Sequence, residues 1–199
     1  MNQLPLSFDE KLFLWLNFDG GATMDTIMEC ISGWFVWVPL YLLIFYMVWR
    51  KFGPRGVFTF VICLALAMGI ADMLCGIFKH SGLLANVWAD FPARHRPMFD
   101  IAVRDLAHVT SYKHGLYGTV SAHAATVAAM AVLSALALRR CWFSWVIGFV
   151  TLLICYSRIY LACHYPKDLA LGLAVGLVCG VAMYFLWRVF YKTLVRYKK

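Results

Sequence analysis

The sequence predicts an all-α integral membrane protein that forms a single membrane-embedded domain over residues 1–199. Hydrophobic residues make up 63% of the chain and charged residues 14%, whereas soluble domains average about 45–50% apolar and about 25% charged residues. Five apolar runs are long enough to cross a bilayer, and basic residues gather at the ends of these runs. The prediction is therefore a bundle of five transmembrane helices, or six if an N-terminal helix also spans.

The N-terminal residues 1–30 are expected to contain an interfacial or partly inserted helix. Apolar residues alternate with polar ones in "KLFLWLNF" (residues 11–18), a pattern that does not separate these two placements. Acids precede the apolar part and a basic start is missing, so a cleavable signal peptide is not indicated.

Five spans follow, because each run holds about 20 mostly apolar residues. They are expected at residues 31–49, 56–78, 120–138, 142–162 and 169–190. Residues 79–119 are polar, contain two prolines and hold no apolar run of spanning length. They are expected to form a long external link that carries part of the active site.

The placement of charge predicts the orientation. Ten of the eighteen Lys and Arg residues, and no acid, lie in residues 50–55, residues 139–140 and the tail 188–199. These segments are predicted to be cytoplasmic, with the tail against anionic lipid. Residues 79–119 and 163–168 then share the external face. The net charge of +8 is thus explained without nucleic acid, and the seven cysteines show no metal-ligand spacing.

Polar residues stand between the last two spans, in "SRIYLACHYPKD" (residues 157–168). Arg158 ends one span, and His164 and Asp168 open the next. Pro166 suits a first helical position, which places Asp168 in the first turn. A carboxylate there can accept a hydrogen bond from one nitrogen of His164 and leave the other nitrogen as a nucleophile.

The third span begins with "GTVSAHAAT" (residues 118–126). Ser121 is a favourable N-cap, and the free N–H groups of a first helical turn attract phosphate. His123 could donate a proton to a leaving group beside that phosphate. The external link supplies Lys79, Arg94 and Arg96, whose charges suit phosphoryl oxygens.

These residues resemble the three motifs of the type 2 phosphatidic acid phosphatases, the PAP2 superfamily of membrane lipid phosphatases, which shares its fold with vanadium haloperoxidases. The third motif is complete in Ser157-Arg158, His164 and Asp168. The second is Ser121-Ala122-His123, with alanine where the family has glycine. The first is Arg96-Pro97 with Lys79 upstream. The resemblance covers roughly residues 56–185.

The resemblance implies a role for each matching residue. His164 would be the nucleophile that forms a phosphohistidine, Asp168 its orienting carboxylate, and His123 the acid that later helps to activate water. The phosphoryl oxygens would be held by Lys79, Arg96, Ser121, Arg158 and the backbone of Ala122. No metal and no cofactor is implied, because the cations neutralise the phosphoryl charge.

Two departures from the family pattern stand out. Sixteen residues separate Lys79 from Arg96, where the family has six, so either an insertion intervenes or Arg94 takes the place of the lysine. Ala122 in place of glycine could narrow the phosphate pocket.

Asp72, inside the second span, is either functional or a structural partner for Lys79 or a hydroxyl group. The histidines at 80, 95, 108 and 114 match no metal-ligand spacing and are expected to be loop residues.

The expected function is a metal-independent phosphatase acting on a lipid at the outer leaflet of a bacterial cytoplasmic (inner) membrane. The preferred substrate is undecaprenyl diphosphate. Lipid A is the first alternative, followed by phosphatidylglycerol phosphate or phosphatidic acid. The expected partners are the substrate and the bilayer, with no nucleic acid and no obligate protein partner. A lipid-headgroup binding or transport protein is the non-enzyme alternative, and a vanadate-dependent oxidase is a more remote one.

Overall fold

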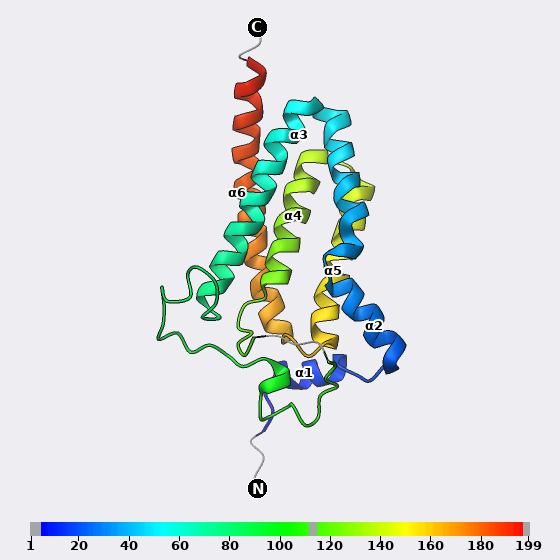
Figure 1. Cartoon of the computed structure of the whole chain (residues 1–199), viewed down its shortest axis with the longest axis vertical. Helices are drawn as coiled ribbons and strands as arrows, with labels where there is room; N and C mark the ends of the chain where they lie inside the picture. The colour runs from blue at the N-terminus through cyan, green and yellow to red at the C-terminus, as the bar shows by residue number, and fades with distance from the viewer. Residues whose placement is uncertain (1–4, 112–114, 197–199) are drawn as a thin grey trace.

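The computed structural model describes residues 5–111 and 115–196, in which helices are joined by turns and loops and no strand is present (Figure 1). His114 and the last three residues of the expected tail 188–199 lie outside the described residues. The elements in chain order are α1 (Phe8–Leu16), α2 (Gly21–Ser32), the 3₁₀ turn η1 (Phe35–Trp37), α3 (Val38–Ile77), the 3₁₀ turn η2 (Pro97–Phe99), α4 (Ala122–Leu138), α5 (Cys141–Tyr160) and α6 (Pro166–Arg196).

The first two expected spans form one helical run, α3, which reverses direction at a bend (Figure 1). At the bend, Gly53 has φ 70° and ψ −175°, a conformation that glycine adopts at little cost. Pro54 follows directly and suits the first turn of the returning helix, because it lacks the N–H group that would find no partner there. The sequence "RKFGPR", expected to link two spans, holds this non-helical Gly53 and forms a tight turn between the two helical arms of α3.

Among the described residues, three helical segments are long and apolar enough to cross a membrane. They are Phe35–Ile77, which contains both arms of α3, Cys141–Tyr160 and Pro166–Leu194. The apolar helix α4 is shorter, with 17 residues, and most of its side chains are buried between the other helices. The all-helical membrane fold is therefore confirmed, whereas the number of spans stays a prediction.

The closest helix contact joins α4 to α6 through small residues. Gly172, Gly176 and Gly180 of α6 lie so close to α4 that a Cβ atom on them would approach backbone oxygens of α4 to 2.4, 2.2 and 2.8 Å. Such small-residue stripes allow helices to pack closely in lipid, where the hydrophobic effect does not drive association. At the end of this contact, the amide of Ser121 donates to the carbonyl of Asp168 (3.0 Å), which joins the starts of α4 and α6.

The N-terminal helix α1 lies across one end of the bundle (Figure 1). It begins with a capping box, in which Ser7 and Glu10 each accept from the other's amide. The ring of Phe13 is fully buried and packs edge-on against Tyr165, with centroids 5.3 Å apart. The side-chain amide of Asn17 donates from Nδ2 to the backbone carbonyls of Ile159 and Tyr160. Residues 5–30 thus lie against the end of α5, while the contact of residues 1–30 with a membrane surface stays a prediction.

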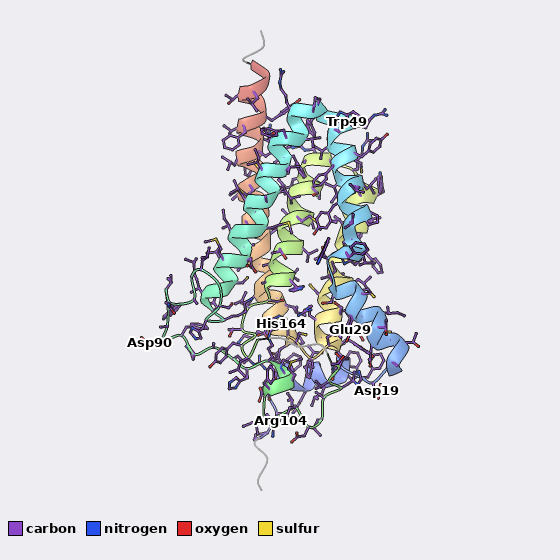
Figure 2. All side chains as sticks on the ribbon, in the orientation of Figure 1. Asp19, Glu29, Trp49, Asp90, Arg104 and His164 are labelled. Carbon is purple, nitrogen blue, oxygen red and sulfur yellow. The ribbon has the colours of Figure 1, made fainter. Side chains whose placement is uncertain are left out.

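The two ends of the bundle differ in charge. His164 lies at the end covered by α1, together with Asp19, Glu29 and Asp90, whereas Trp49 marks the opposite end (Figure 2). The bend of α3, the link between α4 and α5, and the far end of α6 gather at that opposite end (Figure 1). The basic clusters that were predicted to be cytoplasmic therefore share one end, and His164 lies at the other.

We expect Gly176→Ala to lower the melting temperature of the purified protein in detergent by several degrees. The new methyl group would stand 2.2 Å from the carbonyl oxygen of Ala125, and overpacking of this kind costs about 1–3 kcal/mol. The matched control is Gly69→Ala in α3, because a Cβ atom there meets nothing within 4 Å. That change should be neutral or stabilising, by about 0.5–1 kcal/mol. Equal melting temperatures for the two variants would contradict the close contact.

Candidate active site

His164 lies in the tight turn between α5 and α6, and its side chain is buried, with 1% of the residue exposed. Cys163 and His164 both donate their amides to the carbonyl of Arg158 (2.9 and 3.2 Å), which closes the end of α5. Ala162, in between, has φ 51°, an uncommon conformation for a residue other than glycine. The turn therefore fixes the imidazole between the two helices.

Two hydrogen bonds determine which nitrogen of His164 carries the proton. Nδ1 lies 2.9 Å from the carbonyl oxygen of Gly118, and a carbonyl only accepts, so Nδ1 is the protonated nitrogen. Nε2 then accepts from Nη1 of Arg96 at 3.0 Å. The lone pair of a potential nucleophile is thus on Nε2, on the side of the ring that faces a cation.

The surroundings of His164 favour its neutral form. Burial lowers the pKa of His164 well below its usual value, and the positive charges of Arg96, Arg158 and Lys79 lower the pKa further. A neutral imidazole keeps its lone pair at physiological pH, which a nucleophile requires.

Asp168 does not hold His164 in the way that the sequence analysis expected. Its Oδ2 lies 3.8 Å from Nδ1 of His164, which is longer than a hydrogen bond, and accepts instead from the amide of Tyr165 at 3.0 Å. A carboxylate in a first helical turn has free backbone amides close by, and Asp168 caps one of them. The carbonyl of Gly118 therefore orients the ring, while the side chain of Asp168 lies 3.8 Å from it.

Gly118 is the residue of this site that the sequence analysis missed. A Cβ atom at this position would lie 3.0 Å from Cγ of Arg96 and 3.4 Å from Nδ1 of His164. The glycine thus lets its carbonyl approach the imidazole closely. Two glycines shortly before the N-cap Ser121, in "KHGLYGTVS", are the signal that could have indicated a close backbone approach.

Arg96 is fixed by backbone groups of the link. Its amide donates to the carbonyl of Leu116, and the amide of Gly118 donates to the carbonyl of Arg94, so two parts of the link run side by side. The guanidinium of Arg96 also donates to the carbonyls of Gly115 (2.6 Å) and Cys163 (2.9 Å). These contacts therefore aim this cation at His164.

The remaining residues of the second and third motifs lie around the same end. Arg158, in the last turn of α5, is 1% exposed and donates from Nη1 to the hydroxyl group of Ser32. Ser121 is fully buried and caps α4, where its Oγ accepts from the amide of Ala124 at 3.4 Å. Ala122 is the first residue of α4. The N-terminal amides of α4 thus begin beside the start of α6, next to the turn that carries His164.

His123 lies in the first turn of α4 and lines a groove of about 310 Å³. Ser32, which accepts from Arg158, and Asp72 also line this groove, and most of its other lining side chains are apolar, among them Trp37 and Met130. The charges of Arg158, Lys79 and Arg96 act on both His123 and His164. The same three cations therefore act on both imidazoles, and His123 also faces a mainly apolar groove.

Lys79 and Arg94, the two candidates for the lysine of the first motif, have different surroundings. Lys79 follows α3 directly, and burial together with the charges of Arg96 and Arg158 lowers the pKa of its ammonium group. Arg94 instead pairs with Asp9 of α1 at 2.5 Å and lies over the ring of Tyr165 at 3.5 Å. These contacts favour Lys79 as the cation of the site and Arg94 as a tie to α1.

The other polar residues singled out in the sequence have structural contacts. His80 lies 2.9 Å from the carbonyl of Phe91, His95 stacks on Tyr117, and His108 bonds to Asp25. Within residues 5–111 and 115–196, no three His, Cys, Asp or Glu side chains are grouped to hold a metal ion. Over the same residues, no ion pair within 4.0 Å joins Asp72 to Lys79, although the charge of Asp72 acts on the ammonium group of Lys79.

Comparison with known proteins gives consistent matches. The PAP2 superfamily pattern matches residues 73–192. The lipid A 4'-phosphatases of Bacteroides thetaiotaomicron and Porphyromonas gingivalis are each 28% identical to the chain over 179 residues, covering 89% and 90% of this chain and 76% and 72% of those proteins. An undecaprenyl-diphosphatase of Sulfolobus acidocaldarius is 27% identical over 176 residues, covering 86% of this chain and 74% of its own length.

Among solved structures, LpxE of Aquifex aeolicus has a similar fold. The TM-score is 0.61 at 18% sequence identity, and the superposition covers 89% of this chain and 95% of that chain. At this identity the likeness concerns the fold.

We expect His164 to stay neutral at pH 6.5, because burial and three neighbouring cations lower its pKa. Arg96→Gln removes one of these charges, so the pKa of His164 should rise and the ring should take up its proton at a higher pH. Lys79→Gln should act in the same direction without removing a hydrogen bond to the ring. The measurement is a ¹⁵N NMR titration of the histidine rings, with His164→Gln for assignment. An unchanged titration in both variants would show that these cations do not act on the ring.

Proposed function

The chain belongs to the PAP2 superfamily and is a lipid phosphatase, and from this premise we propose that it removes a phosphate group from lipid A or a closely related phosphorylated saccharide lipid. The observation that carries the proposed chemistry is the state of His164. Its Nδ1 proton is engaged by Gly118, its Nε2 lone pair faces Arg96, and three cations surround it.

In the proposed first step, Nε2 of His164 attacks the phosphorus atom while the bond to the lipid oxygen breaks. Arg96, Arg158 and Lys79 neutralise the phosphoryl oxygens, and the amides at the start of α4 donate to them. The negative charge of the bound phosphoryl group offsets the nearby cations and lets His123 take up a proton, which it then gives to the departing lipid oxygen. The imidazole becomes a phosphohistidine, and its remaining proton stays on Nδ1 against the carbonyl of Gly118.

In the proposed second step, a water molecule attacks the phosphohistidine. His123, now lacking its proton, takes one from the water, and the bond between phosphorus and Nε2 breaks to release orthophosphate. Asp168 contributes a carboxylate 3.8 Å from the ring, which stabilises the positive charge that His164 carries while it is phosphorylated. Ser121 keeps its position as the cap of α4, so the amides stay aimed at the phosphoryl group.

The relatives favour lipid A over undecaprenyl diphosphate, which was the preferred substrate in the sequence analysis. Two relatives at 28% identity are lipid A 4'-phosphatases, and the undecaprenyl-diphosphatase relative is matched less strongly. The groove that ends at His123 suits an acyl or prenyl chain, so it supports a lipid substrate without separating the two. Undecaprenyl diphosphate is therefore kept as the second candidate.

The proposed location is a bacterial cytoplasmic membrane, with the active site on its outer face. The long apolar helices suit a membrane protein. The acid-free basic clusters at the bend of α3, in the link between α4 and α5 and at the far end of α6 lie at the end opposite His164 (Figure 1), which supports a cytoplasmic basic end by the positive-inside rule.

We expect the purified enzyme to release phosphate from lipid A with a higher kcat/KM than from undecaprenyl diphosphate, phosphatidylglycerol phosphate or phosphatidic acid in the same detergent. His164→Ala should abolish release from all four lipids, because no other group replaces the nucleophile. Its melting temperature serves as the control for folding. A higher kcat/KM for undecaprenyl diphosphate would reverse the substrate assignment, and turnover by His164→Ala would remove the nucleophile assignment.

We expect Lys79→Ala to lower kcat/KM for the preferred lipid more than Arg94→Ala does. Loss of a charged hydrogen bond to the phosphoryl group costs about 1.5–3 kcal/mol, or roughly 10- to 150-fold in rate. Arg94→Ala removes contacts to Asp9 and Tyr165, so its main effect should be a lower melting temperature. The opposite order of the two rate losses would assign the cation of the first motif to Arg94.

A further inference from the structure

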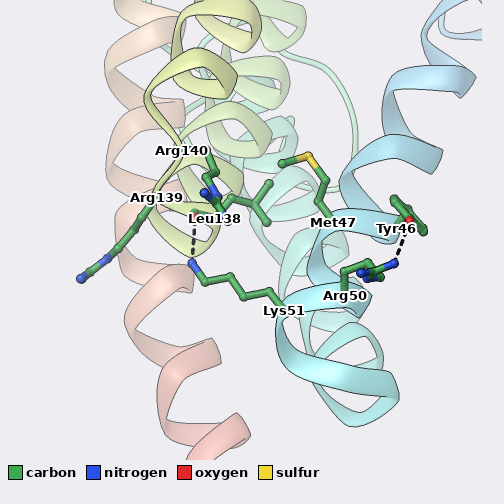
Figure 3. A pocket seen from close by; sticks show the side chains of 7 residues that line it. All are labelled: Tyr46, Met47, Arg50, Lys51, Leu138, Arg139 and Arg140. Atoms are coloured by element: carbon green, nitrogen blue, oxygen red, sulfur yellow. Dashed lines mark hydrogen bonds between the residues drawn. The ribbon is translucent and has the colours of Figure 1, made fainter.

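The end of the bundle opposite His164 contains a pocket that the phosphatase chemistry does not use. It has a volume of about 690 Å³ and lies between the first arm of α3 and the link from α4 to α5 (Figure 3). Arg50, Lys51, Arg139 and Arg140 line it. We propose that this pocket binds the phosphate of an anionic membrane lipid in the leaflet opposite the catalytic site.

In the part of the chain that the structure describes, the charges around the pocket have no anionic side chain as a partner. Residues 30–71, 106–167 and 169–199 contain no Asp or Glu, and all four cations come from these stretches. Among the described residues, none of the four forms an ion pair. Like charges held close together repel one another, so an anion in their midst lowers the energy of the site.

Hydrogen bonds hold two of these cations in place. Nζ of Lys51 donates to the carbonyls of Ala137 and Leu138 (2.9 and 2.6 Å), which ties α3 to the last turn of α4 (Figure 3). Arg139 ends α4 in a left-handed conformation with φ 54°, a position where glycine is more usual. Its Nη2 donates to the hydroxyl group of Tyr184 of α6 at 3.2 Å, which fixes this guanidinium on the α6 side of the pocket.

The first turn of α5 adds backbone N–H donors beside the pocket. It starts at Cys141, directly after the two arginines, and no side chain caps its first turn. A helix start of this kind, next to Arg139 and Arg140, is suited to a phosphate group. The pocket thus offers guanidinium groups and a helix N-terminus together.

The rim of the pocket indicates a lipid as the source of the phosphate. Tyr46, Met47 and Leu138 give it an apolar side. Nearby, Trp49 and Trp142 are 55% and 53% exposed on the outside of α3 and α5. Exposed tryptophans beside basic residues are typical of the level of lipid headgroups, where anionic lipids attract Lys and Arg. The acyl chains would then lie along the outer surface of the helices.

The test is the thermal stability of the full-length protein in a neutral detergent, titrated with short-chain phosphatidylglycerol, short-chain phosphatidylcholine or inorganic phosphate. We expect saturable stabilisation by phosphatidylglycerol and none by phosphatidylcholine. In Arg50→Gln/Arg140→Gln, the dissociation constant for phosphatidylglycerol should rise at least tenfold. Arg139→Gly is the second variant, because glycine tolerates the positive φ while the cation is lost.

Two controls separate this pocket from other effects. Lys11→Gln/Arg104→Gln removes the same charge at the other end of the bundle, and Arg96→Gln disturbs the catalytic site; both should keep the affinity within twofold. Wild-type affinity in the pocket variants, or equal stabilisation by phosphatidylcholine, would overturn the proposal. Stabilisation by inorganic phosphate alone that is lost in the pocket variants would overturn the lipid as ligand and assign a soluble phosphate.

Discussion

The close packing of α4 against α6 is the constraint on which the catalytic end depends. Three glycines of α6 let the two backbones approach, and the amide of Ser121 then reaches the carbonyl of Asp168. This contact sets the start of α4, with His123, beside the turn that carries His164. A phosphoryl-transfer site needs its groups in position before the substrate arrives, and rigid helices provide that position more reliably than loops do.

The sequence predicted the parts of this site that lie on helix ends. The spacing from Arg158 to Asp168 follows from one helix ending and the next beginning, so local patterns were sufficient. The orientation of the imidazole depends instead on the carbonyl of Gly118, a residue of the long link. Asp168 does not orient the ring, because its carboxyl group accepts from the backbone amide of Tyr165. Such long-range choices leave little trace in local sequence, and the roles of Lys79 and Arg94 were left open for the same reason.

The fold was predictable to a similar degree. Apolar runs and basic clusters indicated the helical membrane bundle and which of its ends carries the basic residues. Both properties follow from the kinds of side chain that a bilayer and its cytoplasmic surface accept. The bend at Gly53 and the placement of α1 across the end of the bundle depend on tertiary contacts, such as those of Phe13 and Asn17. Substrate choice was harder still, since undecaprenyl diphosphate and lipid A both present a phosphate and an apolar chain. The relatives, rather than any single residue, favour lipid A.

The hydrogen bond from Arg96 to Nε2 of His164 engages the lone pair that attacks phosphorus in the proposed mechanism. The lone pair cannot accept from the guanidinium and attack phosphorus at the same time, so this hydrogen bond has to break first. The oxygens of a bound phosphoryl group compete with Nε2 for the guanidinium of Arg96. When they accept its hydrogen bonds, the lone pair of Nε2 becomes free to attack. Nε2 of His164 is thereby reactive only when a phosphoryl group occupies the site. Released orthophosphate presents the same oxygens, so it competes with the substrate for Arg96 and inhibits the reaction.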